Sequence, residues 1–381
     1  IPAIGSSSKS TSASVASAIA AEFTGEWLAD YPHIDGVLAI THKGGCAIQV
    51  DGDEYLNLHR TLSGYCRHPN VGGVLLVGLG CETLSAGRIA AEQDGQPAVP
   101  VLSMQEQGGT RATIAAGVKA LAGLLPQADA VRRETIAASE LVLGLECGGS
   151  DGASGITANP VIGAAVDRLI AAGGTAILAE TPEIYGAEHL LTCRARTPAV
   201  ADTLRQRIAW WERYAEFFGA TIDNNPTTGN KAGGLTTIFE KSLGAVAKAG
   251  GTALEGVYRY GERIDRRGLV FMDTPGFDPV SVTGMVAGGA NLVCFSTGRG
   301  SCFGCKPTPS LKIASNTTVY NRLREDMDFD AGQVLTGASV AELGAELLDQ
   351  LLAVASGEAT ASERLGLGDQ EFAPWSVGPV F

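Results

Sequence analysis

Short apolar runs separated by polar, glycine-containing turns recur along this chain. Residues 37–40, 74–77 and 141–145 are runs rich in valine, leucine and isoleucine. Continuous apolar runs of this length are typical of parallel strands that are buried on both faces. Segments with helical spacing lie before the first of these runs, at 15–23, and between the first and second, at 55–67. The pattern therefore predicts a series of β-α units, which is the signature of a parallel sheet covered by helices.

A polar stretch at residues 127–134 interrupts this series and predicts a domain boundary. We expect a first α/β domain over 1–128 and a second α/β domain with a C-terminal helical part over 129–381. The fold class predicted is α/β, with two Rossmann-like parallel-sheet domains and a site between the carboxyl ends of their strands. Further helices are expected at 85–92, 108–125, 161–172, 202–218, 236–249 and 340–356, and further strands at 98–102, 175–179, 269–272 and 291–295.

Composition narrows the class of protein. The formal net charge of −13 and the absence of a basic stripe argue against a nucleic-acid or anionic-membrane binder. Only 18% of the residues are charged, so we expect a partner or a second copy, as in a homo-oligomer, to cover part of the surface. No run is long enough for a transmembrane helix. Eight cysteines without a dense framework suit a reducing cytoplasm, and the start, which has no methionine and no signal-peptide pattern, suggests part of a larger enzyme.

Three cysteines follow the apolar runs, and this placement is the clearest chemical signal in the sequence. Cys46, Cys81 and Cys147 each come shortly after a predicted strand, and His42 lies four residues before Cys46. Three thiols at one sheet edge are suited to a soft metal or an iron–sulfur cluster. The alternative for each of them is a small buried apolar side chain.

Polar residues follow several other predicted strands. The segment Glu146-Cys147-Gly148-Gly149-Ser150-Asp151-Gly152 leads through Asn159 into a helix, and its glycines allow backbone amides to approach an anionic ligand. A weaker signal of the same kind is Glu180, in Glu180-Thr181-Pro182-Glu183. A glycine-rich βα turn without a ligand is the alternative for both segments.

Three charged residues in loops complete the candidates. Lys231 lies among glycines before a helix, where a lysine neutralises an anion or acts as a base when desolvated. Asp273 and Arg299 each follow a predicted strand, and the arginine is suited to clamping a carboxylate. Solvated loop charges are the alternative for all three. The Cys302/Cys305 pair lacks a second pair of ligands and is interpreted as incidental.

Several longer motifs together resemble the altronate and galactarate dehydratase family. They cover nearly the whole chain and are specific for the superfamily but not for one member of it. The segments that carry the resemblance are Arg60-Thr61-Leu62-Ser63-Gly64-Tyr65, His68-Pro69-Asn70-Val71-Gly72-Gly73, Gly78-Leu79-Gly80-Cys81-Glu82, Glu146-Cys147-Gly148-Gly149-Ser150-Asp151, Gly155-Ile156-Thr157-Ala158-Asn159-Pro160, Glu180-Thr181-Pro182-Glu183-Ile184-Tyr185-Gly186-Ala187-Glu188, Asn230-Lys231-Ala232-Gly233-Gly234-Leu235-Thr236-Thr237, Asp273-Thr274-Pro275-Gly276 and Thr297-Gly298-Arg299-Gly300-Ser301.

The resemblance implies a carbon–oxygen lyase that performs iron-dependent β-elimination on a sugar acid such as altronate or galactarate and gives a 2-keto-3-deoxy acid. It implies Fe²⁺ or an iron–sulfur cluster, with Cys46, Cys81, Cys147 and His42 as the candidate metal ligands. The family pattern has a cysteine-containing turn where this chain has Ser6-Ser7-Ser8. Such dehydratases also carry a small SAF domain that this chain lacks, so a separate small subunit is a possible partner.

We assign hypothetical roles on this basis. Lys231, Asp273 and Arg299 are the candidate catalytic residues, with Lys231 or Asp273 transferring the proton and Arg299 holding the carboxylate. The candidate substrate-binding residues are Ser150, Asp151, Asn159, Glu180 and Arg299. One alternative is the large subunit of a sulfolactate sulfo-lyase, a carbon–sulfur lyase that releases sulfite, and another is a non-catalytic ligand-binding or regulatory subunit. A nicotinamide-dependent dehydrogenase is disfavoured because no Gly-x-Gly-x-x-Gly follows the first strand.

Overall fold

The computed structural model describes residues 2–6, 12–44, 48–93, 99–222 and 225–377, in two compact units that are described separately. The first unit comprises residues up to 135 together with 372–377, and the second comprises 136–371. The sequence analysis assigned 372–377 to the second domain, whereas the structure groups them with the first unit. There Phe372 packs edge-on against Tyr65, with ring centroids 4.8 Å apart.

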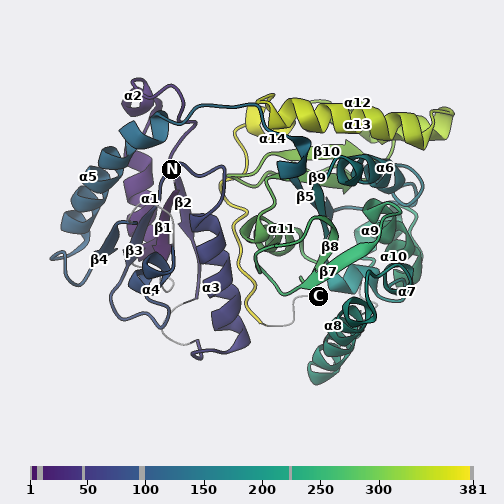
Figure 1. Ribbon diagram of the computed structural model, residues 1–381, viewed down its shortest axis with the longest axis horizontal. Helices are drawn as coiled ribbons and strands as arrows, with labels where there is room; N and C mark the ends of the chain where they lie inside the picture. The colour runs from purple at the N-terminus through teal and green to yellow at the C-terminus, as the bar shows by residue number, and fades with distance from the viewer. Residues whose placement is uncertain (1, 7–11, 45–47, 94–98, 223–224, 378–381) are drawn as a thin grey trace. The chain divides into compact units, whose positions relative to one another are not determined.

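The first unit is built on a four-stranded parallel sheet in the order β2-β1-β3-β4 (Figure 1). Helices α1 and α5 pack on each other, and Ile19 of α1 lies with Leu121 of α5 in one apolar core. The elements are β1 Pro2–Ser6, α1 Ser12–Glu22, α2 Gly25–Leu28, β2 Leu38–Thr41, α3 Asp53–Cys66, β3 Leu75–Gly78, α4 Ala86–Ala91, β4 Val101–Ser103 and α5 Thr110–Asp129.

The second unit is built on a seven-stranded parallel sheet in the order β11-β10-β9-β5-β6-β8-β7. Its strands are β5 Val142–Cys147, β6 Thr175–Leu178, β7 Leu254–Tyr258, β8 Gly268–Met272, β9 Leu292–Thr297, β10 Ser310–Ala314 and β11 Phe329–Asp330. The α-helices are α6 Ala158–Ala171, α7 His189–Thr192, α8 Pro198–Phe217, α9 Thr228–Ala232, α10 Ile238–Val246, α11 Asp278–Gly288, α12 Thr317–Arg322, α13 Val340–Ala355 and α14 Ala361–Arg364. Short 3-10 turns are η1 Ala138–Glu140, η2 Thr181–Ile184, η4 Ala247–Ala249 and η5 Ala331–Thr336.

The two faces of β5 carry different neighbours because successive strand side chains point to opposite faces. Leu143 and Leu145 belong to the large apolar core formed with α6 and α13. Gly144 lies on the other face, where a side chain would meet Met285 of α11. By this alternation, Glu146 points to the same face as Gly144, and Cys147 points to the same face as Leu145. Neighbouring residues at the end of one strand are thereby directed to opposite sides of the sheet.

The predicted parallel α/β architecture is confirmed, with one large and one smaller parallel sheet. The finer description, two Rossmann-like domains divided at residue 128, stays a prediction. The sequence analysis did not anticipate β7, β10 or β11. In β10 the fully buried Lys312 interrupts the apolar run that would have marked a strand. Among the described residues, no helix is both long and apolar enough to span a membrane.

Candidate active site at the carboxyl edge of the large sheet

Four strands of the large sheet deliver polar residues to one edge. Because β5, β6, β8 and β9 are parallel, the segments that follow them lie at the same edge, which is where ligands of such sheets bind. The chain there continues as Gly148-Gly149-Ser150-Asp151 after β5 and as Ala179-Glu180 after β6. Glu180 has a left-handed backbone conformation, with φ 66° and ψ 72°, which is a strained geometry for a residue with a side chain.

A cysteine, a carboxylate and two lysines form one side of a buried cluster at this edge. The Cys147 sulfur lies 3.1 Å from Oε2 of Glu183 and accepts a hydrogen bond from Nζ of Lys248 at 2.9 Å. Glu183 also forms a buried ion pair with Lys241. Lys241 further donates to Oδ1 of Asn225 at 2.6 Å. Each ammonium group therefore has a defined partner in the protein interior.

The charges in this cluster fix one another. Burial opposes ionisation of Glu183, but the ammonium groups of Lys241 and Lys248 outweigh it and lower the pKa of Glu183 to about 2. Burial likewise disfavours the charged form of both lysines, yet the surrounding acidic groups raise the pKa of each of them. Burial raises the pKa of the Cys147 thiol to about 12. At neutral pH the cluster thus holds an ionised Glu183, two ammonium groups and a protonated thiol.

Three carboxyl groups form the other side of the cluster. Glu146, Glu180 and Asp278 each have an oxygen within 4.8 Å of the others, and Cys147, Glu180 and Glu183 form a second such group, so Glu180 belongs to both. Burial raises the pKa of Glu146 to about 7, and burial together with the charge of Glu183 raises that of Asp278 to about 6. Burial and the neighbouring charges of Glu146 and Glu183 hold the pKa of Glu180 well above its usual range. The structure therefore contains a group of cysteine and acidic side chains able to hold a metal ion.

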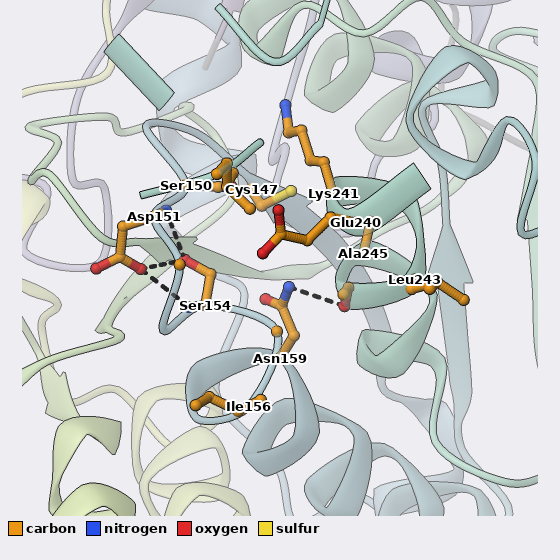
Figure 2. Close-up of a pocket in the computed structure, with 14 residues that line it drawn as sticks. Cys147, Ser150, Asp151, Ser154, Ile156, Asn159, Glu240, Lys241, Leu243 and Ala245 are labelled. Carbon is orange, nitrogen blue, oxygen red and sulfur yellow. Dashed lines mark hydrogen bonds between the residues drawn. The ribbon is translucent and has the colours of Figure 1, made fainter. Parts of the chain in front are cut away.

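A cavity of about 240 Å³ adjoins this cluster (Figure 2). Cys147 and Lys241 line it, so these two residues belong to both the cavity and the cluster. Asn159 also lines the cavity, and its amide donates to the Gly244 carbonyl at 2.9 Å. Figure 2 also shows Asp151, whose carboxylate accepts from the Ser154 hydroxyl at 2.8 Å. A small anionic ligand in this cavity would lie next to the lysine and the thiol.

The candidate substrate-binding residues of the β5 turn take different positions. Ser150 and Asp151 both line the cavity. The Asp151 carboxylate also accepts hydrogen bonds from Ser315 and Asn316, so it ties the β5 and β10 turns together. Oδ1 of Asn159 accepts from the Ser296 hydroxyl at 2.7 Å.

The candidate catalytic residues lie around this site in unequal environments. Lys231 is exposed on α9, a helix whose Asn230 amide donates to the Ser150 carbonyl at 2.9 Å. Arg299 is exposed after β9. Asp273 is buried and accepts hydrogen bonds from Thr181 at 2.6 Å and from Trp211 at 2.8 Å. Burial raises the pKa of Asp273 despite these donors. The catalytic roles of all three residues stay predictions.

The predicted metal ligands are divided between the two units. Cys147 is in the second unit, whereas Cys81 and His42 are in the first, and Cys46 lies outside the described residues. His42 is buried, and burial lowers its pKa to about 4. Neither ring nitrogen of His42 has a hydrogen-bond partner within the described part of the chain. The set of three thiols and a histidine stays a prediction.

The sequence analysis overlooked the two lysines of the cluster, the acidic role of Glu183 and the contribution of Asp278. One signal for the lysines was available. Lys241 and Lys248 lie seven residues apart in a segment that was predicted to be helical, so both fall on one face, close to apolar positions. Asp278 begins α11, where an acidic residue is usually explained by the helix dipole alone.

Comparison with known proteins gives a family match over nearly the whole chain. Residues 138–380 match the family described as D-galactarate/altronate dehydratase, C-terminal. Residues 6–129 match the second domain of D-galactarate dehydratase/altronate hydrolase.

Three relatives illustrate the similarity. Altronate dehydratase of Escherichia coli is 40% identical over 332 residues, which are 87% of this chain and 66% of that protein. Galactarate dehydratase (L-threo-forming) of the same organism is 38% identical over 331 residues, 84% of this chain and 63% of that protein. The (2R)-sulfolactate sulfo-lyase subunit beta of Chromohalobacter salexigens is 35% identical over 346 residues, 88% of this chain and 86% of that protein. The chain thus spans about two thirds of the length of the dehydratases that it matches.

Proposed function

This chain belongs to the D-galactarate/altronate dehydratase family, and on that premise we propose that it is the lyase part of an enzyme that removes water from a sugar acid such as altronate or galactarate. The product is a 2-keto-3-deoxy acid. The observation that carries the proposal is the buried cluster of acidic, thiol and ammonium groups beside a cavity at the carboxyl edge of the large sheet.

Elimination beside a carboxylate has three requirements. The substrate carboxylate must be held, the hydrogen at the α-carbon must be removed, and the hydroxyl at the β-carbon must leave. The enol that forms takes up a proton from solvent at the β-carbon and becomes the keto acid. A positioned proton-transfer group contributes about 10²- to 10⁴-fold to such a reaction.

Lys241 is suited to the first requirement. It lines the cavity, and its ammonium group is held in place by Glu183 and Asn225. An ammonium group has three donors, so two are used by these partners and one is available to a ligand. Because Lys241 is 7% exposed, a carboxylate bound there meets a cation that is only weakly screened by water. Arg299 is the second proposed carboxylate ligand.

The residues present also fit the iron that the family resemblance implies. Buried carboxylates and a thiol are ligands of a first-row divalent metal, and two of the carboxylate oxygens, Oε2 of Glu146 and Oε1 of Glu180, lack a hydrogen-bond donor among the described residues. The side chains of this unit that are candidates to hold iron form two overlapping groups, Cys147, Glu180 and Glu183 on one side and Glu146, Glu180 and Asp278 on the other. A bound divalent iron supplies Lewis acidity that eases departure of the hydroxyl.

The proton-transfer roles of Lys231 and Asp273 have a kinetic test. If either residue moves the proton, Lys231→Ala or Asp273→Asn should lower kcat by about 10²- to 10⁴-fold with little change in KM. Asparagine keeps the oxygen that accepts from Thr181 and Trp211, so the second variant separates catalysis from folding. Near-normal kcat in both variants rejects the assignment.

A second candidate function is elimination of sulfite from sulfolactate. It is supported by the similarity to the (2R)-sulfolactate sulfo-lyase subunit beta, which is 35% identical over 346 residues. On this reading a small subunit carrying an SAF domain is the partner. A homo-oligomer and a cytoplasmic location stay predictions under either function.

A substrate screen distinguishes these functions. Anaerobically purified protein, supplied with Fe²⁺, is assayed on altronate, galactarate and sulfolactate, with and without a candidate small subunit. We expect a keto acid from one of the two sugar acids. Release of sulfite from sulfolactate alone would establish the second candidate, and no turnover on any of the three under either condition would favour a non-catalytic ligand-binding subunit.

A further inference from the structure

The two sides of the buried cluster differ in how their charges are balanced. Lys248 donates to Cys147, and Lys241 pairs with Glu183, so both ammonium groups are bound on the thiol side. Within the described residues, no ion pair joins either lysine to Glu146, Glu180 or Asp278. Of the described residues, no cation is in direct contact with the carboxylate side.

Strand geometry explains this division. Glu146 and Cys147 are consecutive at the end of β5, so their side chains point to opposite faces of the sheet. Glu146 lies on the face covered by α11, which begins with Asp278, and Cys147 lies on the face covered by α6 and the turn that holds Lys248. Glu180, in its left-handed conformation beyond β6, is shared by both groups.

The carboxylate side is buried and incompletely satisfied. Glu146 is 0% exposed and Glu180 is 1% exposed, yet Oε2 of the first and Oε1 of the second lack a hydrogen-bond donor among the described residues. The other oxygen of Glu146 accepts a long bond, 3.3 Å, from the backbone N–H of Cys147. Buried carboxylates require a proton or a cation between them when no donor is present.

The backbone is shaped to bring the third carboxylate close. A side chain at Gly148 would overlap Oδ2 of Asp278 and the ring of Phe295, so glycine is required for Asp278 to approach the end of β5. With a metal ion bound and all four carboxyl groups of the cluster ionised, the two ammonium groups would leave two formal negative charges to be balanced. This excess equals the charge of one divalent cation.

We propose that Glu146, Glu180 and Asp278 form an all-oxygen site for a hard or borderline divalent cation, Mn²⁺ or Fe²⁺, and that Lys248 keeps the Cys147 thiol out of the coordination sphere. Oxygen-only donor sets select hard cations, whereas thiolates select soft ones such as Cd²⁺. This inference rests on the proposed function in that it specifies the ligands of the metal cofactor. Metal binding to the site is measured without substrate. Failure of the dehydratase assignment would therefore leave this inference standing, and the converse also holds.

The test is direct binding of Mn²⁺ to metal-free protein. Binding is measured from the loss of the electron paramagnetic resonance signal of the free ion and by calorimetry. The wild-type protein and Cys147→Ser should bind one equivalent with similar affinity. Glu180→Gln and Asp278→Asn should each weaken binding at least tenfold. Glu240→Gln, which changes a carboxylate in the cavity wall outside the group, is the matched control and should bind like the wild type.

Circular dichroism establishes whether each variant is folded. Asp278 is at a partly exposed position, so Asp278→Asn keeps the test available if the variant at the deeply buried Glu180 does not fold. The proposal is overturned if Mn²⁺ does not bind to the wild-type protein. It is also overturned if Cys147→Ser abolishes binding, or if Cd²⁺ binds with a sulfur-to-metal absorption band that is lost in Cys147→Ser.

Discussion

Lys241→Met is expected to lower kcat/KM for the sugar acid by about 10²- to 10³-fold, because truncating one member of a buried charge pair costs about 2–5 kcal/mol. The lysine has two functions in the proposed site. In the proposed function its ammonium group would bind the substrate carboxylate in the cavity that it lines, and it neutralises Glu183. Methionine keeps most of the length and volume of the side chain, so packing of α10 against η2 is retained.

Steady-state kinetics on the metal-reconstituted protein check this expectation. Lys306→Met is the matched control, because Lys306 pairs with Asp369 at a partly exposed position and should leave kcat/KM within about twofold. A folded Lys241→Met variant with undiminished kcat/KM would remove Lys241 from the site.

Lys248→Met is expected to reduce the free energy of unfolding by about 3–5 kcal/mol, because breaking a buried charge network leaves uncompensated charges behind. Lys248 is 1% exposed and lies among Cys147, Glu183, Glu180 and Glu146. Removing it raises the excess negative charge in a volume with little water. Urea unfolding of metal-free protein at neutral pH measures the effect.

Lys312 provides the control for burial alone. It is 0% exposed, its Nζ donates to the Phe303 carbonyl at 3.0 Å, and burial lowers its pKa. Lys312→Met loses one hydrogen bond but no longer buries an ammonium group, so we expect a change of about 1 kcal/mol or less. Equal losses for the two variants would show that charge balance is not what Lys248 contributes.

The same charges set a pH dependence for metal-free protein. The folded pKa of Glu183, about 2, lies below its ordinary value of 4.5. Glu183 therefore contributes stability that is fully present above about pH 4.5 and is lost as the pH falls toward 2. We expect Lys248→Met to weaken this acid dependence, so that the difference in unfolding free energy from wild type shrinks in acid. A difference that does not change with pH would contradict the assigned influence of Lys248 on the pKa of Glu183.

The strands that end at the site were the most predictable part of the structure. β5 was expected from its apolar run, and the polar turn after it was correctly identified as part of a sheet edge. The strand nevertheless extends through Glu146 and Cys147, because these residues still pair with Phe295 and Ser296 of β9. A sequence run shows where apolar residues end, but backbone pairing shows where the strand ends.

The charges around Cys147 were less predictable because they come from distant segments. Lysines on a helix are usually solvated, and nothing local distinguishes Lys241 and Lys248 from surface lysines until η2 brings Glu183 to them. Lys312 illustrates the same difficulty, because a charged residue inside β10 interrupts the hydrophobic pattern by which the strand would be recognised. Tertiary contacts decide which charges are buried, and they are not encoded in local periodicity.

The central claim is that the cluster at the carboxyl edge of the large sheet eliminates water from a sugar acid. Turnover in D₂O, followed by nuclear magnetic resonance, tests it most directly. Metal-reconstituted wild-type protein should convert altronate or galactarate to a 2-keto-3-deoxy acid that carries deuterium at the former β-carbon. Lys241→Met should form that product at least about 100-fold more slowly. No labelled keto acid from the wild type, or equal rates in the two proteins, would contradict the claim.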